Sequence, residues 1–142
     1  ANIEMKTVLA AGCFDMFNVA HLRYLQNAAK LGDRLVVSVT KDNGVKKGDG
    51  RPIIPEKQRL EIVRAVLKGI AASAKAELFD DGVDALPYWR PDIFAKGHDW
   101  KLRGIPKHIK DYCKKNGIKI VFTKPNPKPT TGSIIERAKC VS

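Results

Sequence analysis

Glycines, carboxylates and basic side chains occur together at two points of the sequence, each directly after an apolar run. Gly12-Cys13-Phe14-Asp15 follows the first run, and Lys96-Gly97-His98-Asp99 follows a later one. A glycine lets the backbone approach a phosphate closely, and free amides at a helix N-terminus favour its negative charge. A carboxylate can accept hydrogen bonds from ribose hydroxyls. The two segments therefore predict a binding site for a phosphorylated nucleoside.

Basic side chains that could bind phosphate follow the first segment. His21 comes just after the glycine turn, on the expected first turn of a helix, where a histidine can donate to a phosphate chain. Lys46 and Lys47 lie in a polar, glycine-punctuated loop, 41–52, which cannot pack a core. Paired lysines in such a loop are either a solvated surface or point charges for phosphates. The sequence leaves both interpretations open.

The elements that would position these groups alternate along the chain. Five apolar runs predict strands at 7–11, 34–40, 77–79, 93–96 and 118–123. Stretches of helical period between them predict helices at 19–31, 55–68, 83–89 and 106–116. Parallel neighbours need long crossovers, so this alternation indicates an α/β fold. We expect a Rossmann-like, doubly wound, five-stranded parallel sheet with helices on both faces.

In a doubly wound sheet, ligands bind beyond the carboxyl ends of the strands, at the point where the winding direction reverses. If the winding reverses between the first and the fourth strand, the Gly12 and Lys96 segments face one crevice. The three prolines of the segment 124–129 fix an extended path after the last strand. We expect that segment to form part of the crevice wall.

Length and composition limit the class of protein. The chain has 142 residues, 44% of them hydrophobic and 29% charged, which predicts one globular domain, 1–142. No apolar run approaches the roughly 20 residues that cross a bilayer. The first five residues lack the basic and apolar regions of an export signal, so a cytoplasmic protein is expected.

The formal net charge of +11 attracts phosphate in any form, from nucleotides to nucleic acid. No aromatic-rich RNA-binding signature and no metal-finger spacing accompanies this charge, which argues against a nucleic-acid partner. The three cysteines are odd in number and show no C-x-x-C spacing. We therefore expect reduced thiols rather than a disulfide framework or structural zinc.

The segment from Gly12 to His21 resembles the opening signature of the cytidylyltransferase-like nucleotidyltransferases, G-x-F-D-x-x-H-x-G-H, and matches four of its six fixed letters. The resemblance continues in Lys47-Gly48-Asp49-Gly50-Arg51-Pro52, in Lys96-Gly97-His98-Asp99-Trp100 and in Thr130-Thr131-Gly132-Ser133-Ile134-Ile135. It covers nearly the whole chain in order. The second and third blocks are most similar to the adenylyltransferase domain that activates heptose 1-phosphate.

The resemblance implies an in-line displacement, in which an acceptor phosphate oxygen attacks the α-phosphorus of a nucleoside triphosphate and pyrophosphate leaves. It implies transfer of AMP from ATP to a sugar or polyol phosphate, with Mg²⁺ present and no metal-ligating residue assigned, and a homodimer. A cytidylyltransferase acting on glycerol 3-phosphate or a similar phosphate is the alternative. The resemblance assigns catalysis to His21, Asn18 and Lys47, and nucleotide binding to Gly12, Cys13, Phe14, Asp15, Lys46, Arg59, Lys96, Gly97, Asp99, Thr130 and Thr131.

Three positions depart from the family pattern. Asn18 replaces the first histidine of H-x-G-H, Ala20 replaces its glycine, and Gly132 replaces a hydroxyl residue. An asparagine can donate a hydrogen bond but cannot become cationic, so charge stabilisation during attack should be reduced. Two interpretations stay open, an active but slow transferase and a nucleotide-binding module with impaired catalysis. Asp15 also has a second interpretation, as the cap of the first helix.

Overall fold

The fold is a five-stranded sheet in the order β3-β2-β1-β4-β5, with every pair parallel. The computed structural model describes residues 5–125 and 134–138. Its strands are β1 (Thr7–Gly12), β2 (Arg34–Thr40), β3 (Lys75–Phe79), β4 (Ile93–Lys96) and β5 (Lys119–Phe122). Its helices are α1 (Val19–Ala29), η1 (Asp42–Gly44), α2 (Glu56–Lys68), η2 (Gly82–Asp84), α3 (Ala85–Trp89), α4 (Asp99–Arg103) and α5 (Lys107–Lys115).

The winding direction reverses between β1 and β4, which is the condition under which the Gly12 and Lys96 segments face one crevice. The chain runs from β1 outward to β2 and β3, and then returns across the sheet to β4 and β5. The last β1–β4 pair is Ala10 with Ala95. Just beyond it, the hydroxyl of Tyr24 donates to Ala95 O (2.6 Å) and accepts from Ala11 N–H (3.1 Å). The two central strands are therefore joined through Tyr24 at the edge where a ligand would bind.

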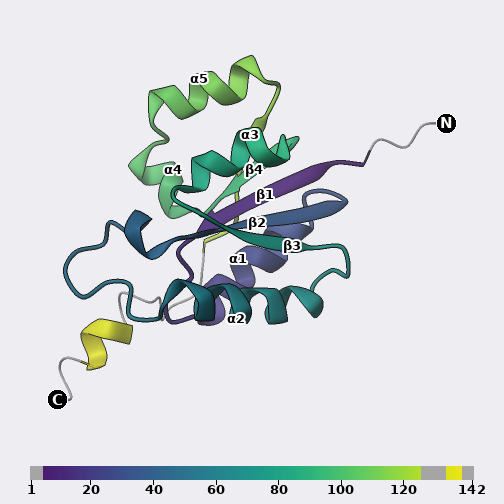
Figure 1. Ribbon diagram of the computed structural model, residues 1–142. Helices are drawn as coiled ribbons and strands as arrows, with labels where there is room; N and C mark the ends of the chain where they lie inside the picture. Colours follow the sequence, from purple (N-terminus) through teal and green to yellow (C-terminus); the bar gives the residue numbers. More distant parts are fainter. Residues whose placement is uncertain (1–4, 126–133, 139–142) are drawn as a thin grey trace.

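Two apolar cores lie on opposite faces of the sheet. On one face, α1 and α2 cover residues such as Val8, Val37 and Val39. On the other, α3 and α5 cover a smaller core around Leu9 and Phe94 (Figure 1). Burial of apolar surface on both faces stabilises such a sheet and holds its strand ends at fixed positions. The predicted doubly wound α/β architecture is confirmed.

The elements differ from the predicted ones mainly in short helices. The helix predicted at 83–89 begins as the 3-10 turn η2, with Asp81 as its cap, and continues as α3. Pro55 is the N-cap of α2 rather than its first helical residue. Local pattern does not predict α4, because the segment Asp99-Trp100-Lys101-Leu102-Arg103 is too short and too polar to show a helical period. Among the described residues, no helix is both long and apolar enough to cross a lipid bilayer.

Gly32 tests how closely the turn before β2 must approach the start of β1, because a Cβ there would lie 2.7 Å from both Lys6 O and a methyl group of Val8. We expect Gly32→Ala to lower the free energy of unfolding by about 1–3 kcal/mol, the usual cost of overpacking. Urea unfolding followed by circular dichroism measures the change. The control is Gly69→Ala, where the nearest atom lies at an ordinary 3.5 Å. Equal stability of the two variants would contradict the close approach.

Candidate active site

Asn18 organises the turn that joins β1 to α1. Its Oδ1 accepts from Ala20 N–H (2.9 Å), and its Nδ2 donates to Met16 O (3.1 Å). Its backbone N–H donates to Nδ1 of His21 (3.1 Å), which completes a capping box. Asn18 is therefore the N-cap of α1, and the capping role considered for Asp15 is wrong. Ala20 is buried, so the methyl group that replaces the family's glycine is accommodated inside the protein.

His21 is a neutral hydrogen-bond donor in the free protein. Because its Nδ1 accepts from Asn18, the ring carries its proton on Nε2. Burial, together with the charge of Lys47, lowers the pKa of His21 from 6.5 to about 4. The ring packs against Phe14 and Phe17, with centroids 5.6 and 5.3 Å away. His21 is not among the residues that line the crevice described below, but the charge of Lys47, which does line it, acts on the His21 ring.

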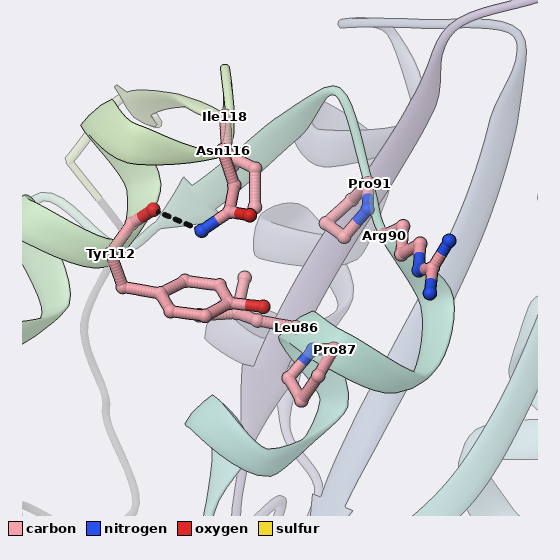
Figure 2. Close-up of a pocket in the computed structure, with 7 residues that line it drawn as sticks. All are labelled: Leu86, Pro87, Arg90, Pro91, Tyr112, Asn116 and Ile118. Atoms are coloured by element: carbon pink, nitrogen blue, oxygen red, sulfur yellow. Dashed lines mark hydrogen bonds between the residues drawn. The ribbon is translucent and has the colours of Figure 1, made fainter.

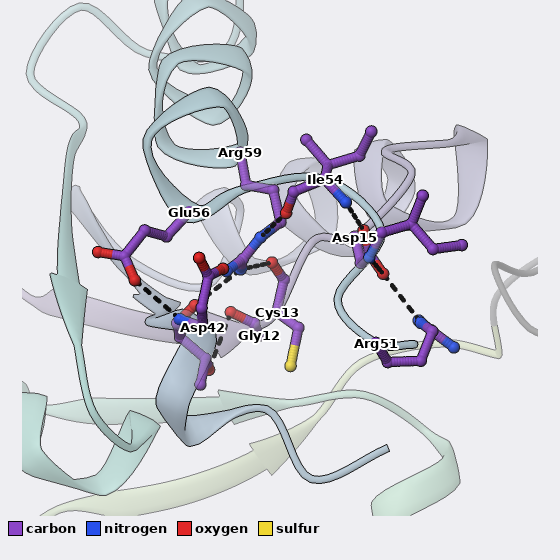
Figure 3. Close-up of polar contacts among 10 residues, drawn as sticks. Gly12, Cys13, Asp15, Asp42, Arg51, Ile54, Glu56 and Arg59 are labelled. Atoms are coloured by element: carbon purple, nitrogen blue, oxygen red, sulfur yellow. Dashed lines mark hydrogen bonds and ion pairs between the residues drawn. The ribbon is translucent and has the colours of Figure 1, made fainter. Parts of the chain in front are cut away.

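Asp15 joins the β1–α1 turn to the segment before α2. Its buried carboxylate accepts from the backbone N–H groups of Ile53 and Ile54 and from Nε of Arg51, each at 2.9 Å (Figure 3). Burial alone would raise the pKa of Asp15, but these hydrogen bonds and the positive charge of Arg51 outweigh it and lower the pKa. The Asp15 carboxylate thus holds the β1–α1 turn to the segment before α2. This geometry gives it a structural role in place of the predicted nucleotide contact.

Arg59 points into the protein rather than toward a ligand. Its side chain is fully buried and donates to Ile54 O, Cys13 O, Thr40 O and a carboxylate oxygen of Asp42, all at 2.7 Å (Figure 3). The phosphate contact predicted for Arg59 is therefore corrected to an internal one. A buried guanidinium needs such a full set of acceptors to compensate for its lost hydration.

The basic loop that carries Lys46 and Lys47 is fixed at both ends. At its start, Asp42 N–H donates to a Glu56 carboxylate oxygen (2.9 Å), and the Asp42 carboxylate accepts from Arg59. At its end, Arg51 is held by Asp15. Between these anchors the two lysines are exposed. The loop can thus present their charges to a ligand while remaining tied to the β1–α1 turn.

The end of β4 supplies a second cationic group. Lys96 Nζ lies 4.1 Å from the centroid of the Trp100 ring and 5.1 Å from that of Phe94. Burial lowers the pKa of Lys96 to about 8, although Asp99 opposes the shift. A Cβ at position 97 would lie 2.8 Å from a carboxylate oxygen of Asp99, an exposed side chain that can move aside. Lys96 is therefore cationic near neutral pH but sensitive to its surroundings.

These groups border one crevice of about 480 Å³ at the carboxyl edge of the sheet. It brings together six of the predicted site residues: Gly12, Cys13, Lys46, Lys47, Lys96 and Asp99. The same crevice is lined by residues to which the sequence analysis gave no role in the site, namely Thr40, Asp81, Arg103 and His108. No local motif marks those four. Phe14, with its side chain buried, contributes to the turn rather than to the lining, and Thr130 and Thr131 lie outside the described residues.

A second hollow, of about 300 Å³, lies between α3 and α5 near the starts of β4 and β5 (Figure 2). Its wall includes Leu86, Pro87, Pro91 and Ile118, and the guanidinium of Arg90 turns away from it in Figure 2. It is at the edge of the sheet opposite to the β1–α1 turn. Ligands of doubly wound folds bind at the other edge, so the first crevice is the candidate active site.

Comparison with known proteins decides the family. The sequence model described as cytidylyltransferase-like matches residues 9–138. The chain belongs to the cytidylyltransferase-like family. The resemblance carried by the motifs is confirmed, and the crevice of this family member lies where its Gly12 and Lys96 motifs meet.

Individual relatives of this cytidylyltransferase-like protein include two kinds of enzyme. The present chain is 42% identical over 104 residues to a bifunctional protein HldE of Vibrio vulnificus, and this match covers 70% of the present chain and 21% of HldE. It is 34% identical to an FAD synthase of Methanosarcina barkeri, with 93% and 95% of the two chains covered. A solved structure, the lipopolysaccharide core biosynthesis protein of Thermoplasma volcanium, is 30% identical with a TM-score of 0.69 and covers 87% of this chain and 100% of that one. The chain thus spans about a fifth of the HldE proteins that it matches.

The neutral state of His21 can be measured directly. We expect its imidazole to titrate at about 4 in NMR spectra of the free protein, because the folded environment disfavours the cation. Lys47→Ala should raise this pKa by removing a neighbouring positive charge, whereas Lys114→Ala, on α5, should leave it unchanged. A midpoint near 6.5 in the unmodified protein would contradict the assigned environment.

Asn18 provides a separate test of capping against direct contact with substrate. Asn18→Ala should lower the free energy of unfolding by about 1 kcal/mol, whereas Asn18→Ser should retain the cap and most of the stability. Thermal unfolding measures both changes. If turnover falls as far in the serine variant as in the alanine variant, the amide itself contacts substrate, and the capping explanation is insufficient.

Proposed function

We propose that this protein transfers AMP from ATP to a sugar or polyol phosphate and releases pyrophosphate. The observation that carries this proposal is the crevice at the point where the winding reverses, lined by Lys46, Lys47, Lys96 and Arg103 but by only two carboxylates, Asp81 and Asp99. Such an excess of positive charge suits a triphosphate and an acceptor phosphate bound side by side. Family membership supports the same reaction class.

In the proposed reaction, an oxygen of the acceptor phosphate attacks the α-phosphorus and the bond to the leaving pyrophosphate breaks. Such a reaction needs mainly position and positive charge. Lys46 and Lys47 are the mobile charges, since they are exposed on a loop anchored at both ends. The His21 Nε2–H and the backbone of Cys13 and Phe14 are the neutral donors. Lys47, His21 and, through its cap, Asn18 are the residues on which turnover depends most.

The nucleoside lies by Lys96, Gly97 and Asp99 in this proposal. Asp99 is exposed at the start of α4 and can accept from ribose hydroxyls. Thr130 and Thr131 are proposed to close the triphosphate end. ATP is preferred to CTP on the similarity of the Lys47 and Lys96 motifs to those of heptose-phosphate adenylyltransferases. A homodimer remains a prediction.

Mg²⁺ is proposed to arrive with the triphosphate. Among residues 5–125 and 134–138, no group of three or more His, Cys, Asp or Glu side chains could hold a metal by itself. Mg²⁺ commonly keeps several waters and binds through substrate phosphates with one or two carboxylates. Asp81 and Asp99 are the carboxylates that the crevice offers. Bound there, the ion would neutralise charge on the phosphates.

FMN is a second candidate acceptor, because FAD is FMN joined through its phosphate to AMP. The FAD synthase relative aligns over 95% of its own length, whereas HldE aligns over 21%. The crevice wall also includes apolar residues, among them Val83, Ile105 and Ile109. A flat ring system would bury this wall better than a polyhydroxylated sugar would.

A pyrophosphate-release assay that crosses ATP and CTP with sugar phosphates, glycerol 3-phosphate, an amino-alcohol phosphate and FMN tests the proposal. We expect turnover with ATP and one acceptor class. Lys47→Ala should reduce it by about tenfold or more, because a charged phosphate contact is lost. The matched control, Lys114→Ala, should retain it.

Each alternative has its own result in this assay. A several-fold preference for CTP would overturn the choice of base and favour the glycerol-phosphate cytidylyltransferase. Triphosphate binding without turnover on any acceptor would indicate the nucleotide-binding module with impaired catalysis. Equal effects of Lys47→Ala and Lys114→Ala would favour the other interpretation of the loop lysines, as part of a solvated surface.

A further inference from the structure

The Cys13 carbonyl is held from inside the protein. Nη1 of Arg59 donates to it at 2.7 Å, and the same nitrogen donates to Thr40 O at 2.7 Å. Cys13 belongs to the lining of the crevice, whereas the Arg59 side chain is fully buried beneath it (Figure 3). The carbonyl side of this peptide group is therefore fixed by the core, while Cys13 itself lines the candidate active site.

This contact fixes the direction of a backbone donor. In the described chain the cis peptide is Arg51–Pro52, so Cys13–Phe14 is trans and its N–H points opposite to its C=O. With the carbonyl turned toward Arg59, the Phe14 N–H points away from α2. Within the described part of the chain, no group accepts a hydrogen bond from this N–H. It is the donor that a phosphate could use.

Phe14 does not favour this orientation by itself. Its φ is 53°, in the left-handed region that a residue with a side chain rarely adopts. Rotating the Cys13–Phe14 peptide by half a turn would return φ to the negative range. The same rotation would place the carbonyl where the N–H had been, so that a negative dipole would face the phosphates. The Arg59 hydrogen bond opposes that rotation, because it is lost when the carbonyl leaves.

We propose that Arg59 is a positioning residue for triphosphate binding, which keeps the Phe14 N–H rather than the Cys13 carbonyl directed toward the phosphates. The inference rests on the proposed function, since it requires a polyphosphate in the crevice. It assigns Arg59 an effect on the ligand without a contact to it.

The test combines Arg59→Lys with the control Arg64→Lys, on the same helix. Arg64 is half exposed and pairs with Glu77, away from the turn. A lysine at position 59 keeps the charge, but its single ammonium nitrogen cannot reach all four acceptors that Arg59 binds through three nitrogens. The probes are MgATP, inorganic tripolyphosphate and adenosine, followed by ¹H–¹⁵N NMR titration. Thermal unfolding verifies that each variant is folded.

In the unmodified protein, MgATP and tripolyphosphate should both shift the Phe14 amide signal. Arg59→Lys should lower the affinity for both ligands by about tenfold or more and abolish that shift, as expected when a hydrogen-bond donor to a charged group is lost. Adenosine, which has no phosphate, should bind the variant and the unmodified protein equally. Arg64→Lys should change none of these values.

Unchanged affinity of Arg59→Lys for tripolyphosphate overturns the inference and leaves the proposed function standing. An equal loss for adenosine overturns it as well, since that result describes a general structural defect. If Arg59→Lys does not fold, the titration of the unmodified protein decides. A Phe14 amide signal that stays in place while the signals of Lys47 shift with tripolyphosphate would show that the Phe14 N–H does not donate to the phosphates, and this would overturn the inference. Absence of any shift with MgATP or MgCTP overturns the proposed function together with the inference.

Discussion

The structure of the site depends on one buried guanidinium that joins three separate stretches of chain. Arg59 on α2 binds the carbonyl after β1, the last carbonyl of β2 and the carbonyl of Ile54, and it pairs with Asp42. Backbone carbonyls at strand ends have lost their partners in the sheet and would be costly to bury alone. A cation in their midst satisfies them, and they in turn compensate for its lost hydration. Removing either side would leave the other unsatisfied, so the turn, the loop start and α2 hold their positions together.

The buried carboxylate of Asp15 does for the end of the basic loop what Arg59 does for its start. Its carboxylate receives two backbone N–H groups and Arg51, so it fixes the end of the loop whose start Arg59 and Glu56 fix. Neither buried charge is left to bind a ligand. The charges that face solvent, Lys46 and Lys47, lie on the chain between these anchors, where little packing holds them. Because its ends are fixed and its centre is exposed, the loop can adjust its lysines to a bound polyanion without disturbing the sheet.

Local pattern was enough to predict a parallel sheet with helices on both faces, because buried strands such as 34–40 and the helical period of 55–68 are continuous signals. It left open where along the sheet the winding reverses. The contacts of Arg59 and Asp15 could not be predicted from local pattern. An arginine in an amphipathic helix has the same local signature whether it lies at the surface or in the core, and its partners here are up to 46 residues away. Asn18 shows the same limit, since the family pattern suggested a reacting group where the fold places a cap. The crevice residues Asp81, Arg103 and His108 come together only through the packing of η2, α4 and α5 at one edge.

The loss of the first histidine of the family signature is less severe in this geometry than its chemistry alone suggests. A second histidine would matter most as a cation, yet His21, which is retained, has a pKa of about 4 and is neutral in the free protein. Burial and the charge of Lys47 keep it so. Positive charge comes instead from Lys46, Lys47, Lys96 and Arg103, which surround the crevice. In the proposed reaction the site separates two tasks, with lysines and an arginine supplying charge and with backbone amides and a neutral imidazole supplying direction. In such a division the Asn18 side chain contributes as the cap of α1, which needs no positive charge. The backbone N–H of Asn18, which any residue except proline would supply, holds the His21 ring at Nδ1.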